Sequence, residues 1–379
     1  MLAAVFSWQY PTGVVLKVSL RLMCKATLVK VGFVDMTGNQ WKMQTISMQE
    51  RPPRPMKNGN LAIVDSLIDE EYMQLLEAAW SKVGGYARDI VSDYEDNESV
   101  PSTRAQALEW LRLASAREVS LNSPVLPSGA ALSFLKLARD AYPGFLAGES
   151  NGTNLLFSGD GLQIWRGYYS SSNPLYAPLN QAAATALVDR VKEGVPLRIL
   201  EIGVGTGGAT TTALNALKQV ATAPVSYLAT DISASLLRST ADKLNRRATG
   251  LIEFNFEPYD FNAEPVRKRV STGGFDVVLA VNALHNAYNL PASLRMLSSL
   301  LKEGGVLITS ESICGSGEQV HQEFFLNLLP LPEHRQGCSS RFLCSEDWQH
   351  AIGNAGLKSD IAINSIGPEL MLLATASKI

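Results

Sequence analysis

A glycine loop between an apolar strand and a helix constrains this chain more than any other feature. The strand pattern at residues 197–200 runs into Glu201, and Gly203, Gly205 and Gly207 follow at alternating positions. Glycine lets the backbone turn sharply and lie against a ligand without an intervening Cβ, and the next helix start offers unpaired N–H groups. The spacing differs from the G-x-G-x-x-G fingerprint that meets a pyrophosphate. The loop therefore predicts a nucleotide-containing cofactor that is not a dinucleotide.

Composition sets wide limits on everything else. The chain has 379 residues, is 46% hydrophobic and carries a formal net charge of −3. It can bury one large core with a smaller one attached, but it has no basic field for nucleic acid. Its apolar runs fall short of the roughly 20 residues that span a bilayer. Four cysteines without paired spacing indicate reduced thiols, so we expect a cytoplasmic protein with no nucleic-acid or membrane partner.

The N-terminal part reads as strands followed by a linker. Apolar and polar residues alternate over residues 15–22, a pattern typical of a strand. Consecutive prolines in residues 51–55 supply no hydrogen-bond donors for a sheet and favour an extended linker. We therefore predict a short β-rich segment with a Pro-rich linker over residues 1–55.

The remaining chain divides into a helical part and an alternating part. Ser66 with Asp69 resembles a capping box, and helical periodicity recurs after it, which predicts a mainly helical subdomain over residues 56–190. Over residues 191–379 strands and helices alternate, which predicts parallel strands with right-handed crossovers. The fold class is therefore α/β, with a doubly wound, mostly parallel sheet.

Acidic residues follow two further strand patterns of the alternating part. The strand at residues 225–230 ends in Asp231, a position from which a carboxylate can accept both ribose hydroxyls of an adenosine. The alternative is that Asp231 caps the next helix in an Asp-x-Ser pattern. Asp260 and Phe261 follow the strand pattern at residues 251–256 and are candidates for the adenine edge and face.

A histidine and a glutamate follow the next two strand patterns. His285 comes after the strand at residues 275–281, and Glu311 ends the strand at residues 305–310. Ligands of a doubly wound sheet bind at the carboxyl ends of its strands, so both side chains are expected at one cleft. A histidine can take a proton near neutral pH, and a carboxylate on its far nitrogen fixes the tautomer. The alternative is a packing histidine. His321, His334 and His350 lack metal-ligand spacing, so we assign them no role and predict no metal.

Together these motifs resemble the methyltransferase domains embedded in polyketide synthases, which use S-adenosylmethionine (SAM). The resemblance covers about residues 159–357 and rests on residues 200–208 (LEIGVGTGG), 230–233 (TDIS), 275–278 (FDVV), 282–285 (NALH) and 300–305 (LLKEGG). It implies a Rossmann-like class I methyltransferase core with an N-terminal, mainly helical lid. It also implies a catalytic dyad of His285 and Glu311, and substrate-pocket aromatics near Tyr168, Tyr169 and Tyr176. The implied SAM-binding residues are Glu201, facing the methionyl ammonium, with Gly203, Gly205, Gly207, Asp231, Ile232, Asp260, Phe261 and Asn282.

The resemblance further implies a reaction and partners. A methyl group would pass from SAM, leaving S-adenosylhomocysteine (SAH), to the α-carbon of a β-ketoacyl thioester on the phosphopantetheine arm of an acyl carrier protein. Neighbouring synthase domains would be further partners. O-methylation of a polyketide hydroxyl and a non-catalytic methyltransferase remnant remain alternatives, whereas Glu201 ahead of the glycines disfavours a nicotinamide oxidoreductase. Two interpretations of residues 1–50 remain: they are the end of a neighbouring module, or they form an extra sheet of the lid.

Overall fold

The computed structural model consists of two compact units, residues 1–52 and 53–379. It describes residues 3–9, 15–21, 68–94, 100–116, 129–170, 172–244, 250–263, 270, 272–314, 319–332, 335, 336, 338, 340–366 and 370–378. In the first unit, β1 (Ala3–Gln9) pairs antiparallel with β2 (Val15–Arg21), which confirms the strand predicted at residues 15–22. The linker predicted at residues 51–55, Ser66 and His334 lie outside the described residues.

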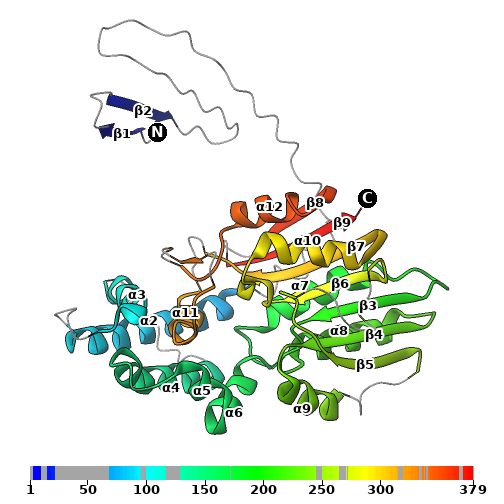
Figure 1. The fold of residues 1–379 in the computed structure, drawn as a ribbon, viewed down its shortest axis with the longest axis horizontal. Helices are drawn as coiled ribbons and strands as arrows, with labels where there is room; N and C mark the ends of the chain where they lie inside the picture. Colours follow the sequence, from blue (N-terminus) through cyan, green and yellow to red (C-terminus); the bar gives the residue numbers. More distant parts are fainter. Residues whose placement is uncertain are drawn as a thin grey trace, which may run out of the picture. The chain divides into compact units, whose positions relative to one another are not determined.

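A seven-stranded sheet forms the centre of the second unit, in the order β5-β4-β3-β6-β7-β9-β8 (Figure 1). The first five strands of that order are parallel, and β9 runs antiparallel between β7 and β8. The predicted doubly wound, mostly parallel sheet is therefore confirmed. The strands are β3 (Leu197–Ile202), β4 (Val225–Asp231), β5 (Ile252–Pro258), β6 (Phe275–Val281), β7 (Leu301–Ser312), β8 (Leu357–Ile366) and β9 (Met371–Lys378).

Helices cover both faces of this sheet, which explains why its strands are apolar on both sides. Alternate residues of β3 enter different cores: Ile199 belongs to the cluster with α7 and α8, and Leu200 to the cluster with α10 and α12. One face packs against α7 (Ala177–Val188), α8 (Gly208–Val220) and α9 (Ala234–Leu244), and the other against α10 (Leu290–Leu300) and α12 (Ser345–Gly353).

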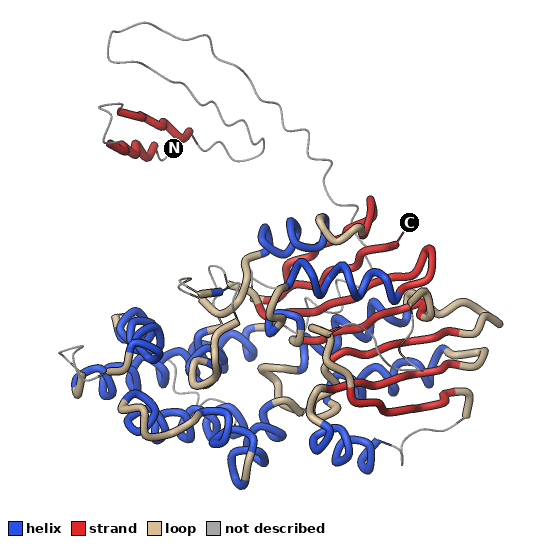
Figure 2. The backbone as a smooth tube through the Cα atoms, viewed as in Figure 1, coloured by secondary structure: helices blue, strands red, loops and turns tan. Residues whose placement is uncertain are grey.

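A helical lid stands at the carboxyl end of the parallel strands, and Figure 2 shows the separation of helices from strands. It contains α2 (Glu70–Ser92), η2 (Ser102–Arg104), α3 (Ala105–Ser115), α4 (Gly129–Leu146), α5 (Gly152–Phe157) and α6 (Gly159–Tyr168). The start of α2 corrects the predicted capping box. Asp69 is itself the N-cap, and its carboxylate accepts from the backbone N–H of Tyr72 at 2.8 Å.

One helix from beyond β7 is built into the lid. Every residue of α11 (Val320–Leu326) is buried, and it packs against α2 and α4. The Phe325 ring stacks on Phe134 of α4, with centroids 3.8 Å apart and planes 7° apart. The Trp110 indole of α3 donates to the Glu323 carboxylate at 2.8 Å. Residues of the lid, of α11 and of the sheet belong to one hydrophobic cluster, so the lid and the sheet share one continuous core.

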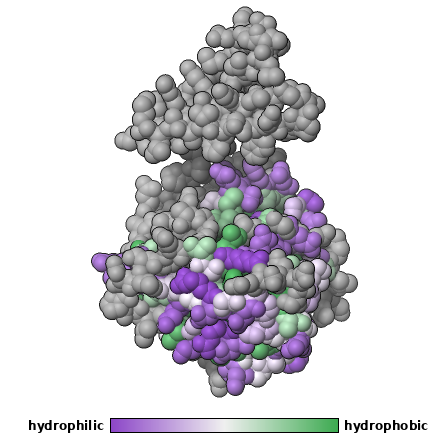
Figure 3. All heavy atoms as spheres, turned by 90° about the vertical axis from the view of Figure 1, so that its left-hand side faces the viewer, coloured by the Kyte–Doolittle hydropathy of each residue, from purple (hydrophilic) through white to green (hydrophobic). Residues whose placement is uncertain are grey.

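The outer surface of the lid end is turned to the viewer in Figure 3. Where residues are described, that face is mainly hydrophilic, with small and separate apolar areas. None of the described helices combines the length and apolar character that crossing a membrane requires.

Candidate active site

The carboxyl ends of β3, β4 and β6 open into a cavity of about 680 Å³ between the sheet and the lid. Small-molecule and cofactor sites commonly have volumes of about 300–1,000 Å³. Most of the lid-side wall is apolar or aromatic, including Phe157, Trp165, Tyr169 and Leu326, whereas the sheet side contributes glycines and polar groups. The sheet side includes Gly203, Gly205, Asp231, Asn282 and His285.

Two glycines of the loop, Gly203 and Gly205, line this cavity, whereas Gly207, also expected to bind SAM, lies outside the lining and against α9. Gly203, Gly205 and Gly207 have φ angles of +70°, +52° and +77°, values that side chains with a Cβ rarely adopt. A Cβ on Gly203 would lie 2.9 Å from the Cβ of Ala283, which fixes glycine there. A Cβ on Gly205 would meet nothing nearer than a carbonyl oxygen at 3.8 Å and would stand in the cavity. The loop therefore leaves room for a ligand against its backbone.

Asp231 holds the loop while keeping acceptor capacity. Its Oδ2 accepts from the Gly205 N–H at 2.9 Å, and its Oδ1 accepts from the Ser233 N–H at 2.8 Å. Each carboxylate oxygen can accept a second hydrogen bond, so two sites remain for ligand hydroxyls. Burial raises the pKa of Asp231, although both backbone donors oppose that rise. The hydroxyl of Ser233, rather than Asp231, accepts from the Leu236 N–H in the first turn of α9.

Of three further residues expected to bind SAM, two line the cavity. Ile232 is 65% exposed and lines the cavity, and Phe261 lines it as well. Asp260 is not among the lining residues, and its Oδ1 accepts from the Asn262 N–H at 2.9 Å. Contact between Asp260 and an adenine stays a prediction.

Glu201 lies behind the loop and not in the cavity lining. Both of its carboxylate oxygens accept from the Thr210 hydroxyl, at 3.0 and 2.8 Å, and Oε2 also accepts from the Tyr227 hydroxyl at 2.8 Å. Burial raises its pKa to about 7, and the two hydroxyl donors oppose the rise. The expectation that Glu201 faces the cofactor is therefore corrected: its side chain joins the loop-bearing strand to α8 and β4.

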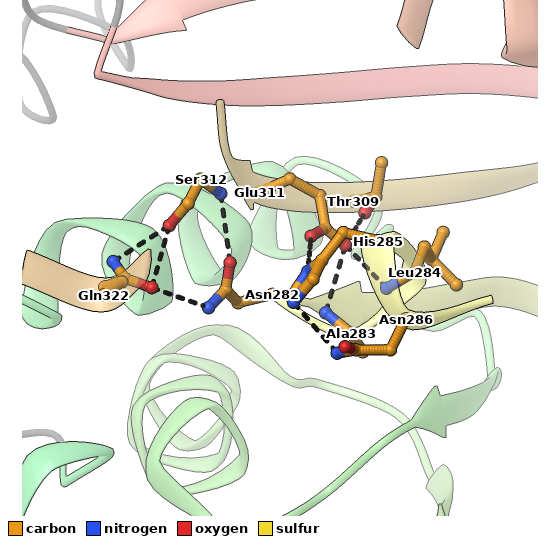
Figure 4. Close-up of polar contacts among 9 residues, drawn as sticks. All are labelled: Asn282, Ala283, Leu284, His285, Asn286, Thr309, Glu311, Ser312 and Gln322. Carbon is orange, nitrogen blue, oxygen red and sulfur yellow. Dashed lines mark hydrogen bonds and ion pairs between the residues drawn. The ribbon is translucent and has the colours of Figure 1, made fainter. Parts of the chain in front are cut away.

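His285 and Glu311 meet at the cavity as a buried pair (Figure 4). His285 Nδ1 lies 2.8 Å from Glu311 Oε2. Glu311 Oε1 accepts from the N–H groups of Ala283 and Leu284, at 3.1 and 2.8 Å, and from the Thr309 hydroxyl at 3.2 Å. With these donors on Oε1, Glu311 is the acceptor for the His285 ring as well. The network thus assigns the proton of neutral His285 to Nδ1 and leaves a lone pair on Nε2.

Asn282 fixes the end of β6 beside this pair. It is the one non-glycine residue with positive φ in the described ranges, at +49°. Its Oδ1 accepts from the Ser312 N–H at 3.1 Å, and its Nδ2 donates to Gln322 Oε1 at 3.3 Å (Figure 4). These bonds tie β6 to β7 and to α11, so Asn282, which lines the cavity, joins the sheet to the lid.

Of the three tyrosines expected at the substrate pocket, two line the cavity. Tyr169 and Tyr176 do so, with ring centroids 4.8 Å apart and planes at 82°. Tyr168 is buried away from the lining, and its hydroxyl lies 2.7 Å from His321 Nε2. Consecutive residues at the end of α6 point in different directions, which corrects the expectation for Tyr168. Burial lowers the pKa of His321 to about 3, so this histidine is neutral.

Sequence reasoning missed several polar residues of the lining, among them Arg166 and Asn286. Arg166 is the one guanidinium among the described lining residues, and it donates to the Ser239 hydroxyl of α9 at 2.8 Å. Asn286 places its Nδ2 2.9 Å from His285 Nε2. Its position directly after His285 was the available signal. Within the described ranges, no group of three His, Cys, Asp or Glu side chains is arranged to hold a metal ion.

Comparison with known proteins gives this site a family context. Residues 200–307 match the family described as "Methyltransferase domain". The chain is 28% identical over 188 residues to polyketide synthase PksR of Bacillus subtilis (strain 168), covering 48% of this chain and 7% of that protein. It is 34% identical over 154 residues to the hybrid PKS-NRPS synthetase iliA of Neonectria sp. (strain DH2), covering 41% and 4%. The chain thus spans a small part of the curated relatives it matches.

Solved structures resemble most of the chain in fold. The CurJ carbon methyltransferase matches with a TM-score of 0.64 and 18% identity, covering 84% of this chain and 96% of that one. The CMeT domain of the citrinin polyketide synthase matches with a TM-score of 0.65 and 19% identity, covering 86% and 98%. The trans-methyltransferase CalH, solved in complex with SAH, matches with a TM-score of 0.53 and 19% identity, covering 86% and 93%. By its fold and its sequence relatives, this chain carries a SAM-dependent methyltransferase domain of the kind found in polyketide synthases.

Proposed function

We propose that the chain transfers a methyl group from SAM to the α-carbon of a β-ketoacyl thioester, with His285 as base and Glu311 as its orienting partner. One observation carries this proposal. His285 is held through Nδ1 by a buried carboxylate, while the lone pair of Nε2 lies on the cavity side. That is the arrangement of a general base whose tautomer is fixed.

The cavity lining suits SAM in three respects. Gly205 leaves open space against the loop backbone, where a ligand can lie close. Asp231 keeps two acceptor sites for the hydroxyls of a ribose, and Ile232 with Phe261 offers apolar surface to an adenine. SAM, when bound, supplies a methyl group activated by its sulfonium sulfur. The SAH held by the related CalH structure supports the same cofactor here.

The protein's own part in the reaction is proton removal and alignment. His285 Nε2 takes the α-proton; the C–H bond breaks, and its electron pair spreads over the α-carbon and the adjacent carbonyl oxygens. Protonation makes His285 an imidazolium, which the Glu311 carboxylate stabilises through Nδ1–H. Alignment of the reacting atoms at about 3–3.5 Å supplies a large share of the rate enhancement. The walls formed by Trp165, Tyr169 and Tyr176 would hold the acyl chain for this step.

We further propose that the acyl chain arrives on the phosphopantetheine arm of an acyl carrier protein. The relatives in which this segment occurs are polyketide synthases and a hybrid synthetase, and the chain spans 4–7% of their length. Neighbouring synthase domains would then be further partners. Two of the similar structures are named as a carbon methyltransferase and a CMeT domain, which supports carbon as the acceptor.

Mass spectrometry with methyl-deuterated SAM tests this function. The protein is incubated with β-ketoacyl thioesters of pantetheine and of a carrier protein, and fragmentation locates the label. We expect the label on the α-carbon, and a loss of about 10²–10⁴-fold in rate for His285→Ala with SAH affinity retained. His350→Ala, an exposed histidine of α12, is the matched control and should keep full activity. Label on oxygen, or full activity in His285→Ala, would refute the proposal.

A further inference from the structure

We propose that the side-chain amide of Asn286 is a second catalytic group, which donates a hydrogen bond to the substrate's carbonyl oxygen as the α-proton moves to His285. This inference rests on the proposed role of His285 as the base. It starts from one contact: Asn286 Nδ2 lies 2.9 Å from His285 Nε2, on the ring edge opposite Glu311 (Figure 4).

The hydrogen-bond network determines the direction of that contact. Because His285 Nδ1–H donates to Glu311, Nε2 bears the lone pair, and the Asn286 amide is its donor. A base cannot use a lone pair that another group occupies. The amide must therefore leave Nε2 when a substrate C–H approaches, and its N–H then requires a new acceptor.

The substrate carries an acceptor at the appropriate place. In a β-ketoacyl thioester the α-carbon lies between two carbonyl carbons, so each carbonyl oxygen is two bonds from the carbon that loses the proton. A donor adjacent to the base can reach such an oxygen by turning its amide. Loss of the proton moves negative charge onto that oxygen, and donors directed at developing charge are among the strongest catalytic groups.

Two other side-chain nitrogen donors of the lining, Asn282 and Arg166, are held by partners elsewhere in the fold. Asn282 is fixed at both ends of its amide by Ser312 and Gln322, and it is buried. Arg166 donates to Ser239 across the lid boundary. Asn286 is exposed on the cavity side at the end of the short helix η4 (Leu284–Asn286), so its amide has room to turn. It therefore combines a donor, nearness to the base and freedom to turn.

Hydrogen–deuterium exchange at the substrate α-carbon tests this inference without methyl transfer. The SAH-bound protein is mixed in D₂O with a β-ketoacyl pantetheine thioester, and exchange above the protein-free rate is followed by NMR. We expect Asn286→Ala to slow the exchange by about 10²-fold, the usual effect of losing one such donor. Asn286→Asp keeps the shape but lacks the N–H, and should be slowed at least as much. SAH affinity should stay within about twofold in both.

Two further variants separate the possible outcomes. Tyr288→Phe changes an exposed neighbour outside the lining and should exchange like the wild type. If Asn286→Ala and Asn286→Asp exchange as fast as the wild type or faster, while His285→Ala is slow, the amide only covers the base and the inference is wrong. If His285→Ala exchanges at the wild-type rate, the proposed base is wrong and the role of Asn286 is overturned with it.

Discussion

Replacing Glu311 with glutamine should inactivate His285 by moving the ring proton to the other nitrogen. Glutamine has one oxygen where glutamate has two, so it can serve only one of the two groups of donors around this position. One group is the backbone N–H of Ala283 and Leu284, and the other is Nδ1–H of His285. The oxygen of the glutamine amide can therefore face only one of these two groups, and the NH₂ faces the other.

The buried backbone N–H groups determine the orientation of the amide. If the amide NH₂ faced Ala283 and Leu284, two buried N–H groups would lose their acceptor, at about 1–3 kcal/mol each. The orientation with oxygen toward the backbone is therefore favoured by about 2–6 kcal/mol. In it the NH₂ donates to Nδ1, and the ring proton moves to Nε2. Since 1.36 kcal/mol is a factor of ten, the population of the base form falls by about 30-fold to about 3 × 10⁴-fold. The analogous change in serine proteases costs about 10⁴ in kcat.

The assay is methylation of a β-ketoacyl pantetheine thioester under single-turnover conditions, with ¹⁵N NMR of His285 to report the tautomer. SAH affinity and the melting temperature should change little, because the ring stays hydrogen-bonded. Thr309→Val is the matched control: it removes one donor to Oε1 and leaves the tautomer in place, so it should cost at most severalfold. A Glu311→Gln protein with a protonated Nδ1, or with more than about a tenth of wild-type activity, would refute this reasoning.

Three further changes test other parts of the structure. Gly205→Val should abolish SAH binding measured by calorimetry, because φ of +52° strains a branched residue by about 1–3 kcal/mol and its side chain would enter the cavity; near-native affinity would contradict the loop's role. Glu201→Gln should flatten the pH dependence of stability. Folding raises the pKa of Glu201 from 4.5 to about 7, so protonated Glu201 stabilises the folded state by on the order of 3 kcal/mol below pH 4.5, and this stabilisation is lost as the pH rises to 7. Urea unfolding at pH 5 and pH 8 measures this change in the free energy of unfolding. The same change between the two pH values in variant and wild type would count against the prediction. Phe134→Ala should cost about 3–5 kcal/mol in a single unfolding transition; a separate early transition would argue against a shared core.

The sheet was predictable because its signals are local. The central parallel strands β3, β4 and β6 are short, largely apolar runs, and the residues that follow each of them must lie at the same edge of the sheet. The sequence therefore predicted that Asp231, Asn282, His285 and Glu311 lie at one cleft; the first three line the cavity, and Glu311 lies behind His285, bonded to its Nδ1. The sequence could not predict that the Glu201 side chain lies behind the loop, because its hydroxyl partners Thr210 and Tyr227 come from two other elements.

The lid side of the site depends on contacts between distant segments. Tyr168 and Tyr169 look equivalent in sequence, but only the fold supplies His321, 153 residues later, as the partner that draws Tyr168 away. Similarly, Asn282 meets Gln322 across 40 residues. No periodicity in either segment reports such a pairing, so which aromatic and amide side chains reach the cavity required the structure.

The insertion of α11 into the lid determines how this domain can be grafted into another protein. A graft that takes the sheet alone, cut near residue 190, would carry α11 without its neighbours and expose Phe324, Phe325 and the Glu323 carboxylate to water. A grafted segment should therefore begin before α2, so that the host protein receives the lid and the sheet together. For the same reason, recombination between related sequences should succeed with crossover points before α2 and fail with those between α6 and β3.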